Sequence, residues 1–235
     1  LRIAYLVAQT EKTVLESHPD ATHFRYPAVY GPHQMGGGRE WSFVRRILDR
    51  RPFIVLPDGG LSLFMHGFAG NLAHAVLLAV DQPENSAGQI YHCGDERQLT
   101  MHQIVEVIAT ALDHEWEIVC MPDAIAHPAR YYAERTSHHQ LMDLAKIKRQ
   151  LGYRDVHPAE EALRMTVEWL VANPPADGSS VSGDPFDYAA EDKLVAAYRE
   201  SLASVAAVPF NIPEEMAHPY AHPKEASTTG DHRER

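Results

Sequence analysis

The sequence predicts an α/β fold, in which helices alternate with strands of a parallel sheet. Apolar residues at helical spacing over Ile3–Glu16 are followed, after the stop signal Ser17–Asp20, by the short β-rich segment Ala21–Tyr26. A helix joined to a strand by a short turn is the repeating unit of α/β proteins, and this order recurs further along the chain. With 45% hydrophobic residues among 235, the chain can bury a substantial core.

The remaining elements are predicted from apolar spacing and from the turn residues between them. Helices are expected around Trp41–Leu48, Leu72–Val80, Ile104–Leu112, Leu163–Val171 and Glu191–Val205, and strands over Phe53–Leu56, Gly88–Cys93 and Trp116–Met121. Thr100 and Gln103 have the spacing of a capping box, which indicates that a helix starts directly after Thr100. Pro158 is expected at the first position of the helix that follows it.

The charge distribution argues against several partners. Acidic residues outnumber basic ones by 32 to 21, and no basic run exceeds two residues, so nucleic acid and anionic membranes are poor partners. No stretch approaches the roughly 20 apolar residues of a membrane span, and no basic-then-apolar leader is present, so we expect a soluble, cytoplasmic protein. Cys93, Cys120 and the 15 scattered histidines lack metal-ligand spacing, and no metal site is expected.

The composition changes after Asn173. Residues 174–183 are rich in Pro, Gly and Ser, which is typical of a linker. Residues 174–235 are expected to form an acidic, partly disordered C-terminal extension, in which the predicted helix Glu191–Val205 is the ordered part.

The segment Arg25–Pro32, with sequence RYPAVYGP, directly follows a predicted strand. Such a segment delivers backbone groups and aromatic rings to the carboxyl edge of a sheet, where open α/β folds bind ligands. A rigid exit turn with stacked tyrosines would have the same sequence pattern.

This run resembles the R-x-x-x-V-Y-G-P segment of the extended short-chain dehydrogenase/reductases, the NAD-dependent epimerase/dehydratase family. The similarity extends over about residues 1–172 and includes Pro57–Gly60, Gly88–Asp95 and Asp143–Lys146, in the family's order. It implies the C-terminal part of a Rossmann-like NAD(P)-binding fold, with its later strands and helices only, and a small mixed α/β substrate domain.

The resemblance also implies a division of the chain. Residues 1–35 would form the last helix and strand of the dinucleotide-binding domain. Residues 36–173 would form the substrate-binding region, with 71–97 returning to the Rossmann sheet.

The family's chemistry is hydride transfer to and from NAD or NADP, with a tyrosine as the acid–base residue. The resemblance places Tyr5 in that role, Gln9 at the cofactor ribose, and Tyr26, Pro27 and Val29 at the nicotinamide end. A tyrosine phenol has an ordinary pKa of about 10, which the family lowers with a lysine at the fourth position after it. Gln9 occupies that position here and carries no charge, so Tyr5 could instead be an aromatic residue packed on the sheet.

Two further departures concern the cofactor and the substrate. No G-x-x-G-x-x-G motif occurs in these 235 residues, so we expect either the C-terminal part of a larger protein or a fold without its cofactor half. The strand expected over Leu61–His66 lacks the arginine with which family members meet a diphosphate, and a substrate other than a nucleotide-sugar is expected. His66 is a candidate substrate-pocket donor, although a packed strand histidine is the simpler interpretation.

The sequence therefore predicts an NAD(P)-dependent epimerase, dehydratase or reductase that acts on a small hydroxyl- or carbonyl-bearing molecule. The alternative is a non-catalytic relative that serves as a binding or interaction module. Family members often form dimers through the helix that bears the tyrosine, so a homodimer is expected from the resemblance.

Overall fold

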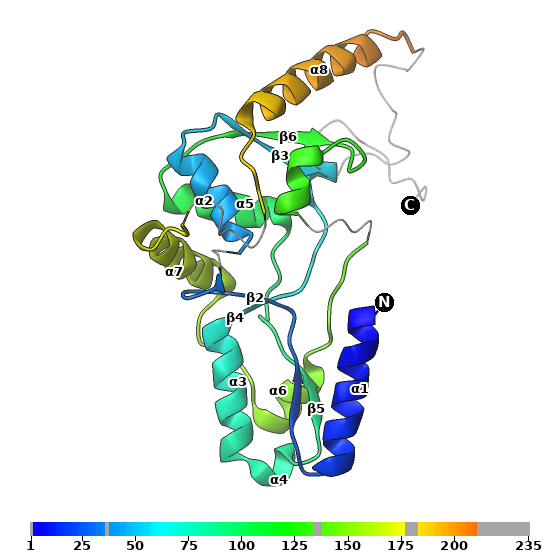
Figure 1. Cartoon of the computed structure of the whole chain (residues 1–235), viewed down its shortest axis with the longest axis vertical. Helices are drawn as coiled ribbons and strands as arrows, with labels where there is room; N and C mark the ends of the chain where they lie inside the picture. The colour runs from blue at the N-terminus through cyan, green and yellow to red at the C-terminus, as the bar shows by residue number, and fades with distance from the viewer. Residues whose placement is uncertain (1, 36–37, 134–137, 177–182, 211–235) are drawn as a thin grey trace, which may run out of the picture. The chain divides into compact units, whose positions relative to one another are not determined.

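The computed structural model describes residues 2–35, 38–133, 138–176 and 183–210, and it divides into two compact units, 1–191 and 192–235 (Figure 1). The helices are α1 (Arg2–Ser17), α2 (Glu40–Leu48), α3 (Ala69–Asp81), α4 (Pro83–Ser86), α5 (Met101–Ala111), α6 (Ala145–Leu151), α7 (Ala159–Ala172) and α8 (Tyr188–Ala206). The strands are β1 (His23–Arg25), β2 (Ala28–Tyr30), β3 (Phe53–Pro57), β4 (His66–Phe68), β5 (Ile90–His92) and β6 (Glu117–Met121). Two 3₁₀ turns, η2 (Asp58–Gly60) and η3 (His127–Tyr131), complete the described elements.

The strands form three parallel pairs, β1–β5, β2–β4 and β3–β6. In the first pair Phe24 lies opposite Tyr91, and in the second Val29 lies opposite Gly67. Each pair joins strands that are distant in the sequence, as the predicted α/β fold requires. The pairing of β5 with β1 is the one that a return of residues 71–97 to the first sheet would need, although the division into domains stays a prediction.

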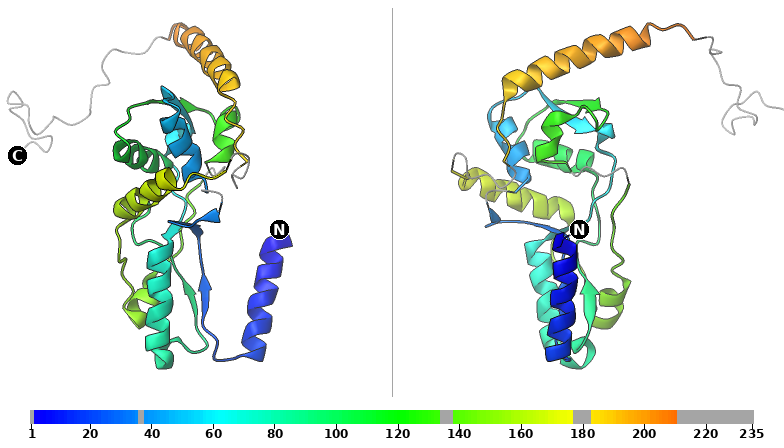
Figure 2. Two further views of the ribbon diagram at one scale, coloured as in Figure 1. Left: turned by 60° about the vertical axis from the view of Figure 1, so that its left-hand side comes forward. Right: turned by 45° about the vertical axis from the view of Figure 1, so that its right-hand side comes forward.

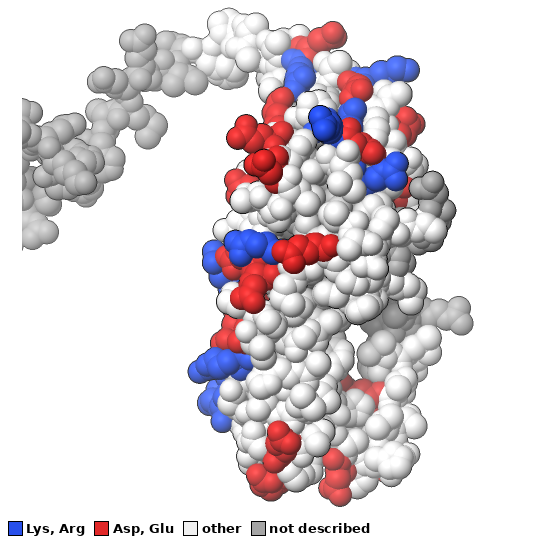
Figure 3. All heavy atoms as spheres, turned by 90° about the vertical axis from the view of Figure 1, so that its left-hand side faces the viewer, with Lys and Arg blue, Asp and Glu red and all other residues white. Residues whose placement is uncertain are grey.

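One hydrophobic core lies around β1 and β5. Leu72 and Ala75 of α3 and Ile147 of α6 are buried there against Tyr91. In Figure 1 and in the left-hand view of Figure 2, this strand pair lies between α1 and α3. On the side that Figure 3 shows, the surface over α3 is largely free of charged side chains.

A second core lies around β3 and β6, whose residues Ile54, Val55 and Leu56 are almost completely buried. Helices α2, α5 and α7 pack against one another beside this pair. The hydroxyl of Tyr132, just after η3, donates a hydrogen bond to the Val55 carbonyl at 2.8 Å. Among the described residues, no helix is both long and apolar enough to cross a membrane.

Most predicted elements are confirmed, with ends shifted by a few residues. Both hydrogen bonds of the predicted capping box are present, since the Thr100 hydroxyl accepts from the Gln103 amide and the Gln103 side chain accepts from the Thr100 amide. The position given to Pro158 is wrong by one residue, because Pro158 is the N-cap of α7 and the first helical residue is Ala159.

Two strands differ from prediction. Strand β2 was not predicted, because Pro27 interrupts the extended segment and the short run after it looks like a loop. The strand expected over Leu61–His66 is wrong, since β4 begins only at His66. Before it, the chain makes isolated hydrogen bonds with the segment around Gln140, whose amide donates to Leu63 and whose carbonyl accepts from Met65.

The C-terminal extension contains the predicted helix, α8, which starts slightly earlier than expected. The linker residues 177–182 and the end of the chain, 211–235, for which disorder was expected, lie outside the described residues.

A buried arginine ties the start of the extension to α2. Arg46 is 1% exposed, and its guanidinium binds the Asp184 carboxylate at 2.6 Å and the Glu191 carboxylate at 2.5 Å. The Arg46 guanidinium also lies over the rings of Tyr132 and Phe186, with its carbon 4.9 and 5.2 Å from their centroids. Because both acids would be left buried without this cation, loss of Arg46 alone should strongly destabilise the first unit.

We predict that Arg46→Ala lowers the free energy of unfolding by about 3–5 kcal/mol, because it removes the buried cation that two buried carboxylates contact. The neighbouring Arg45, which forms a more exposed i,i+4 pair with Asp49, is the matched control. Arg45→Ala should cost less than about 1 kcal/mol. Urea unfolding followed by circular dichroism measures both, and equal losses would contradict the role given to Arg46.

Candidate functional site

A buried carboxylate holds together the carboxyl ends of β2 and β4. Asp95, in the loop after β5, accepts hydrogen bonds from the Tyr30 hydroxyl at 2.8 Å, the Phe68 amide at 2.9 Å and the Asn71 side chain at 3.0 Å. Burial raises the pKa of Asp95, and these three donors act in the opposite direction. A single side chain therefore fixes the end of β2, the end of β4 and the start of α3 relative to one another.

Asn71 extends this network to the loop before α7. Its amide nitrogen also donates to the His157 carbonyl at 2.9 Å, and its carbonyl oxygen accepts from the amides of Val156 and His157 at 2.9 and 3.0 Å. All four hydrogen-bonding positions of this fully buried side chain are therefore used. Because each donor and acceptor of its side chain has a hydrogen-bond partner, an asparagine can be buried at the first turn of α3.

Two glycines allow the close approach of these segments. A Cβ atom at Gly94 would lie 3.1 Å from the His66 carbonyl oxygen, which belongs to the backbone and cannot move away easily. Gly31, directly after β2, has a φ of +145°, and a Cβ there would lie 3.2 Å from the Phe68 ring. Both positions require glycine so that the loops can meet at the site.

His66 lies at the centre of the site and is 5% exposed. Its backbone is held by Gln98, which accepts from the His66 amide at 2.8 Å and donates to its carbonyl at 3.1 Å. Burial and the nearby Arg39 lower the pKa of His66 to about 2, so its imidazole is neutral near pH 7.

Arg39 contacts the Nε2 atom of His66. A guanidinium has only donors, so Nε2 must accept and the ring proton must be on Nδ1. Arg39 is itself oriented by Glu40, whose carboxylate accepts from its Nε atom at 2.8 Å. Sequence reasoning missed Arg39 because it looked for a cation only in the strand next to His66, whereas Arg39 comes from the segment before α2.

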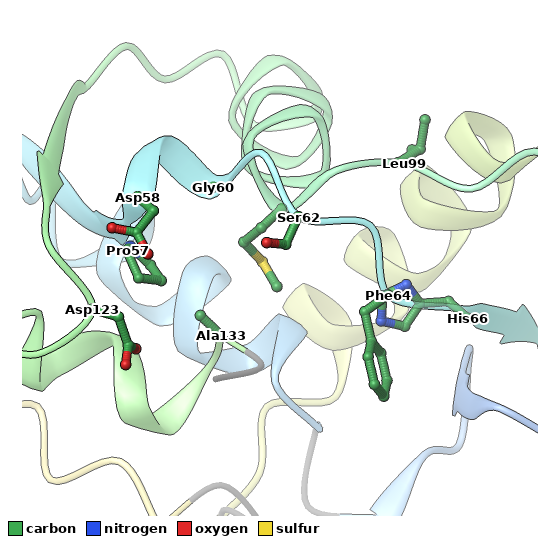
Figure 4. A pocket seen from close by; sticks show the side chains of 10 residues that line it. Pro57, Asp58, Gly60, Ser62, Phe64, His66, Leu99, Asp123 and Ala133 are labelled. Atoms are coloured by element: carbon green, nitrogen blue, oxygen red, sulfur yellow. The ribbon is translucent and has the colours of Figure 1, made fainter. Parts of the chain in front are cut away.

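Two hollows meet at His66 and Leu99. Figure 4 shows the first of them, with Asp58 and Asp123 at one side of it, Phe64 and His66 at the other, and Ser62 between them. The second is lined by Tyr30, Arg39, Asp95, Arg97 and Gln98, among others. Carboxylates and a hydroxyl can bind the hydroxyl groups of a ligand, and guanidinium groups can bind an anionic group. Within the described ranges, no three His, Cys, Asp or Glu side chains are placed to hold a metal ion.

The predicted tyrosine lies on the exposed face of α1. Tyr5 is 64% exposed, and among the described residues it forms no hydrogen bond or ring contact. The opposite face contacts β1 through Glu11, whose carboxylate accepts two hydrogen bonds from Arg25 at 2.6 and 2.8 Å. Gln9 is also exposed, and one turn further the Lys12 ammonium lies 3.7 Å from Glu16 rather than beside the phenol. Among the side chains that the structure describes, none brings a cation to Tyr5.

The residues predicted at the nicotinamide end lie between β1 and β2 and in β2 itself. Tyr26 and Val29 are about half exposed, and the Tyr26 ring stacks on Phe24 with centroids 6.0 Å apart. Pro27 is half-buried and lies between the two strands. These side chains share one segment with Tyr30, which turns inward to Asp95.

Comparison with known proteins identifies relatives over part of the chain. No family model matches. An uncharacterised protein, y4nL, of Sinorhizobium fredii is 27% identical over 171 residues, which are 63% of this chain and 47% of that protein. The dTDP-glucose 4,6-dehydratase of Salmonella typhimurium is 32% identical over 102 residues, which are 43% of this chain and 27% of the enzyme. The chain thus spans less than half the length of these relatives.

Solved structures have the same fold. A UDP-glucose 4-epimerase of Thermotoga maritima superposes with a TM-score of 0.57 at 21% identity, covering 72% of this chain and 52% of the epimerase. A dTDP-glucose 4,6-dehydratase of Bacillus anthracis, solved in complex with NAD, gives 0.51 at 19% identity, covering 64% and 44%. The two dehydratases and the epimerase are nucleotide-sugar enzymes, so the expectation of a substrate other than a nucleotide-sugar has no support.

We predict that Asp155, beside this network, makes the stability of the fold depend on pH. Asp155 accepts from the Glu96 amide at 2.8 Å and from the Tyr153 hydroxyl at 3.0 Å. Burial, with a further contribution from the charge of Asp95, raises the pKa of Asp155 to about 6. The folded state thus holds this proton more tightly than the unfolded chain, where the pKa is about 4. Its stabilising contribution is complete below pH 4 and is lost as the pH rises through about 6.

The measurement is urea unfolding of the wild type and Asp155→Asn between pH 4 and 7. The difference in unfolding free energy between the two proteins should shift in favour of Asp155→Asn as the pH rises. The exposed Asp20 is the control, and Asp20→Asn should show no such shift. A difference between wild type and Asp155→Asn that is constant over this range would show that the assignment is wrong.

Proposed function

We propose that this chain, whose relatives and fold are those of the extended short-chain dehydrogenase/reductase or NAD-dependent epimerase/dehydratase family, forms the substrate-binding part of an NAD(P)-dependent enzyme. The substrate would carry hydroxyl or carbonyl groups. The observation that supports this proposal is the pair of hollows around His66, which are lined by Tyr30 at the carboxyl end of β2 and by Asp58 directly after β3. Open α/β sheets bind their ligands at this edge.

NAD or NADP, when bound, would supply hydride transfer. The family resemblance assigns Tyr26, Val29 and Gln9 to contacts with this cofactor. Their side chains are exposed on this chain, as such contacts require. Tyr26 and Val29, with Pro27 between them, would pack against the nicotinamide end. The Gln9 amide would donate a hydrogen bond to a ribose hydroxyl, and the Tyr5 hydroxyl would exchange a proton with the substrate.

A second candidate function is favoured by the surroundings of Tyr5. Without a cation at position 9, the phenolate that acid–base catalysis needs is not stabilised by charge. A relative that keeps the pocket around His66 and has lost turnover would serve as a binding module. The two functions differ in whether Tyr5→Phe changes the reaction rate of the whole protein.

We propose that the substrate has an anionic group, which Arg39 binds. Its guanidinium lines the second hollow and is fixed by Glu40 and His66, so it is oriented before a ligand arrives. Because Arg39 supplies the cation that the segment before His66 lacks, a nucleotide-sugar with its diphosphate is again a candidate. Ser62, Asp58 and Asp123 of the first hollow would then bind hydroxyl groups.

We predict that the chain binds UDP or dTDP and that Arg39→Gln weakens binding at least tenfold, the equivalent of about 1.4 kcal/mol. Isothermal titration calorimetry measures the dissociation constants. Arg149→Gln, which removes a charge from the exposed surface of α6, is the control and should bind like the wild type. Equal affinities of wild type and Arg39→Gln would contradict the anion-binding role.

We also predict that the 235-residue chain alone binds NAD(H) and NADP(H) only weakly, because its sequence contains no glycine motif to bind their pyrophosphate. Isothermal titration calorimetry measures these dissociation constants as well. Micromolar binding of either dinucleotide would mean that another part of this chain holds the pyrophosphate, and the assignment of the cofactor contacts would have to be revised.

A further inference from the structure

The imidazole of His66 has one ring nitrogen that no described residue binds. Its Nε2 atom contacts the Arg39 guanidinium, and Gln98 binds its backbone amide and carbonyl. Among the residues that the structure describes, none forms a hydrogen bond with Nδ1. His66 is 5% exposed, and polar groups of side chains buried to this extent are normally hydrogen-bonded. The Nδ1 atom is therefore a binding group that the described part of the protein does not use.

The state of this nitrogen follows from the contact that the other nitrogen makes. Burial and the positive charge of Arg39 lower the pKa of His66 to about 2, so the ring carries a single proton near pH 7. The guanidinium has donors only, so the lone pair of Nε2 faces it and the proton is on Nδ1. An imidazole in water more often carries its proton on Nε2. His66 is thus held as the less common tautomer, with Nδ1–H as a donor.

Glu40 orients the arginine that fixes this tautomer. Its carboxylate accepts from the Nε atom of Arg39 at 2.8 Å, and the side chains of Glu40 and Arg39 are only 3% and 13% exposed. Arg39 is the N-cap residue of α2 and Glu40 is the first residue of that helix, so both are anchored at the same helix end. A flip of the imidazole would bring a ring carbon to the guanidinium. The contact with Arg39 therefore fixes the orientation of the ring as well as its proton.

His66 lies where a ligand in either hollow would meet it. It belongs to the lining of both hollows, and Arg39 lines the second. The Nδ1–H bond and the Nε2 lone pair of an imidazole point in widely diverging directions, so the donor points away from Arg39. The ring of Phe64 has its centroid 5.4 Å from that of His66, and Figure 4 shows both residues at one side of the first hollow. A ligand bound by Arg39 therefore has a neutral N–H group of His66 beside it.

We propose that the Nδ1–H group of His66 is a specificity-determining donor, which binds a hydroxyl or carbonyl oxygen of the reacting part of the substrate while Arg39 binds its anionic group. This inference rests on the proposed function, because it takes the two hollows as the substrate pocket. Arg39 directs only part of its N–H groups to Glu40 and His66, so it can fix the tautomer and bind the ligand together. His66 cannot act as a base toward this substrate, because Nε2 is engaged and Nδ1 already carries the proton.

The first test identifies the protonated ring nitrogen of His66 by nuclear magnetic resonance of the full chain labelled with ¹⁵N-histidine. Long-range correlations separate a protonated from an unprotonated nitrogen, and His66→Gln identifies the signals by their loss. We expect the proton on Nδ1 in the wild type, and a return toward the common Nε2–H tautomer in Arg39→Met. The exposed His18 is the internal control and should show averaged signals in both proteins. A wild-type proton on Nε2, or a tautomer that Arg39→Met leaves unchanged, would overturn the proposal.

The second test compares UDP with UDP-glucose, which adds the hydroxyl groups of a sugar after the diphosphate, by isothermal titration calorimetry. The wild type should bind UDP-glucose roughly tenfold more tightly than UDP, the size of one hydrogen bond in a buried site. His66→Gln places an amide oxygen near the position of Nε2 but has no donor near that of Nδ1, so it should lose this preference and still bind UDP. His66→Asn places an amide nitrogen near the position of Nδ1 and should retain a large part of the preference.

The outcomes separate this inference from the proposed function. If the wild type binds both compounds and His66→Gln weakens both equally, His66 acts only through Arg39 and the donor role is wrong, whereas the proposed pocket stands. If the wild type binds neither compound, the anion-binding pocket of the proposed function is wrong, and the ligand role of His66 is overturned with it. Circular dichroism melting checks that the variants are folded, and the tautomer of the wild type decides the donor role where one is not.

Discussion

The arrangement of the site depends on one buried carboxylate. Asp95 binds groups from β2 and from the distant segment in which α3 directly follows β4, and Asn71 extends the same network to the loop before α7. A buried carboxylate is expensive unless several donors surround it, so the donors and the acid constrain one another. The position of His66, at the start of β4, follows from this constraint. The proposed ligand pocket is therefore built on a polar network rather than on the hydrophobic cores at either side.

The fold could be predicted where local rules decide the structure. The capping box at Thr100 and the apolar spacing of α2, α3 and α7 were sufficient, because each helix buries one face. Strand β2 could not be found in this way. It is short, it follows Pro27, and it exists because β4 pairs with it from a distant part of the chain. The strand predicted over Leu61–His66 was wrong for the opposite reason. Its residues favour a strand, but most of them do not pair regularly with a neighbouring strand.

The site was predictable only in part. His66 was a candidate because it precedes a glycine turn, but its neutrality and its contact with Arg39 depend on burial and on a residue 27 positions away. No arginine lies between Arg51 and Arg97, and Arg39, the guanidinium that contacts His66, comes from an earlier segment of the chain. The expectation of a substrate other than a nucleotide-sugar has no support, because the absence of an arginine from one segment of the sequence does not exclude a contribution from another segment that folds next to it.

Tyr5 and the pocket around His66 lie on structures of different stability. The pocket is fixed by buried hydrogen bonds, whereas the face of α1 that carries Tyr5 is exposed and the helix is tied to β1 by the partly exposed pair of Arg25 and Glu11. Such a pair contributes little free energy in water, so α1 should open more easily than the rest of the first unit. Catalysis requires that the acid–base group is held in place relative to the substrate. Ligand binding at His66 does not require this, so binding can persist under conditions where catalysis through Tyr5 is lost.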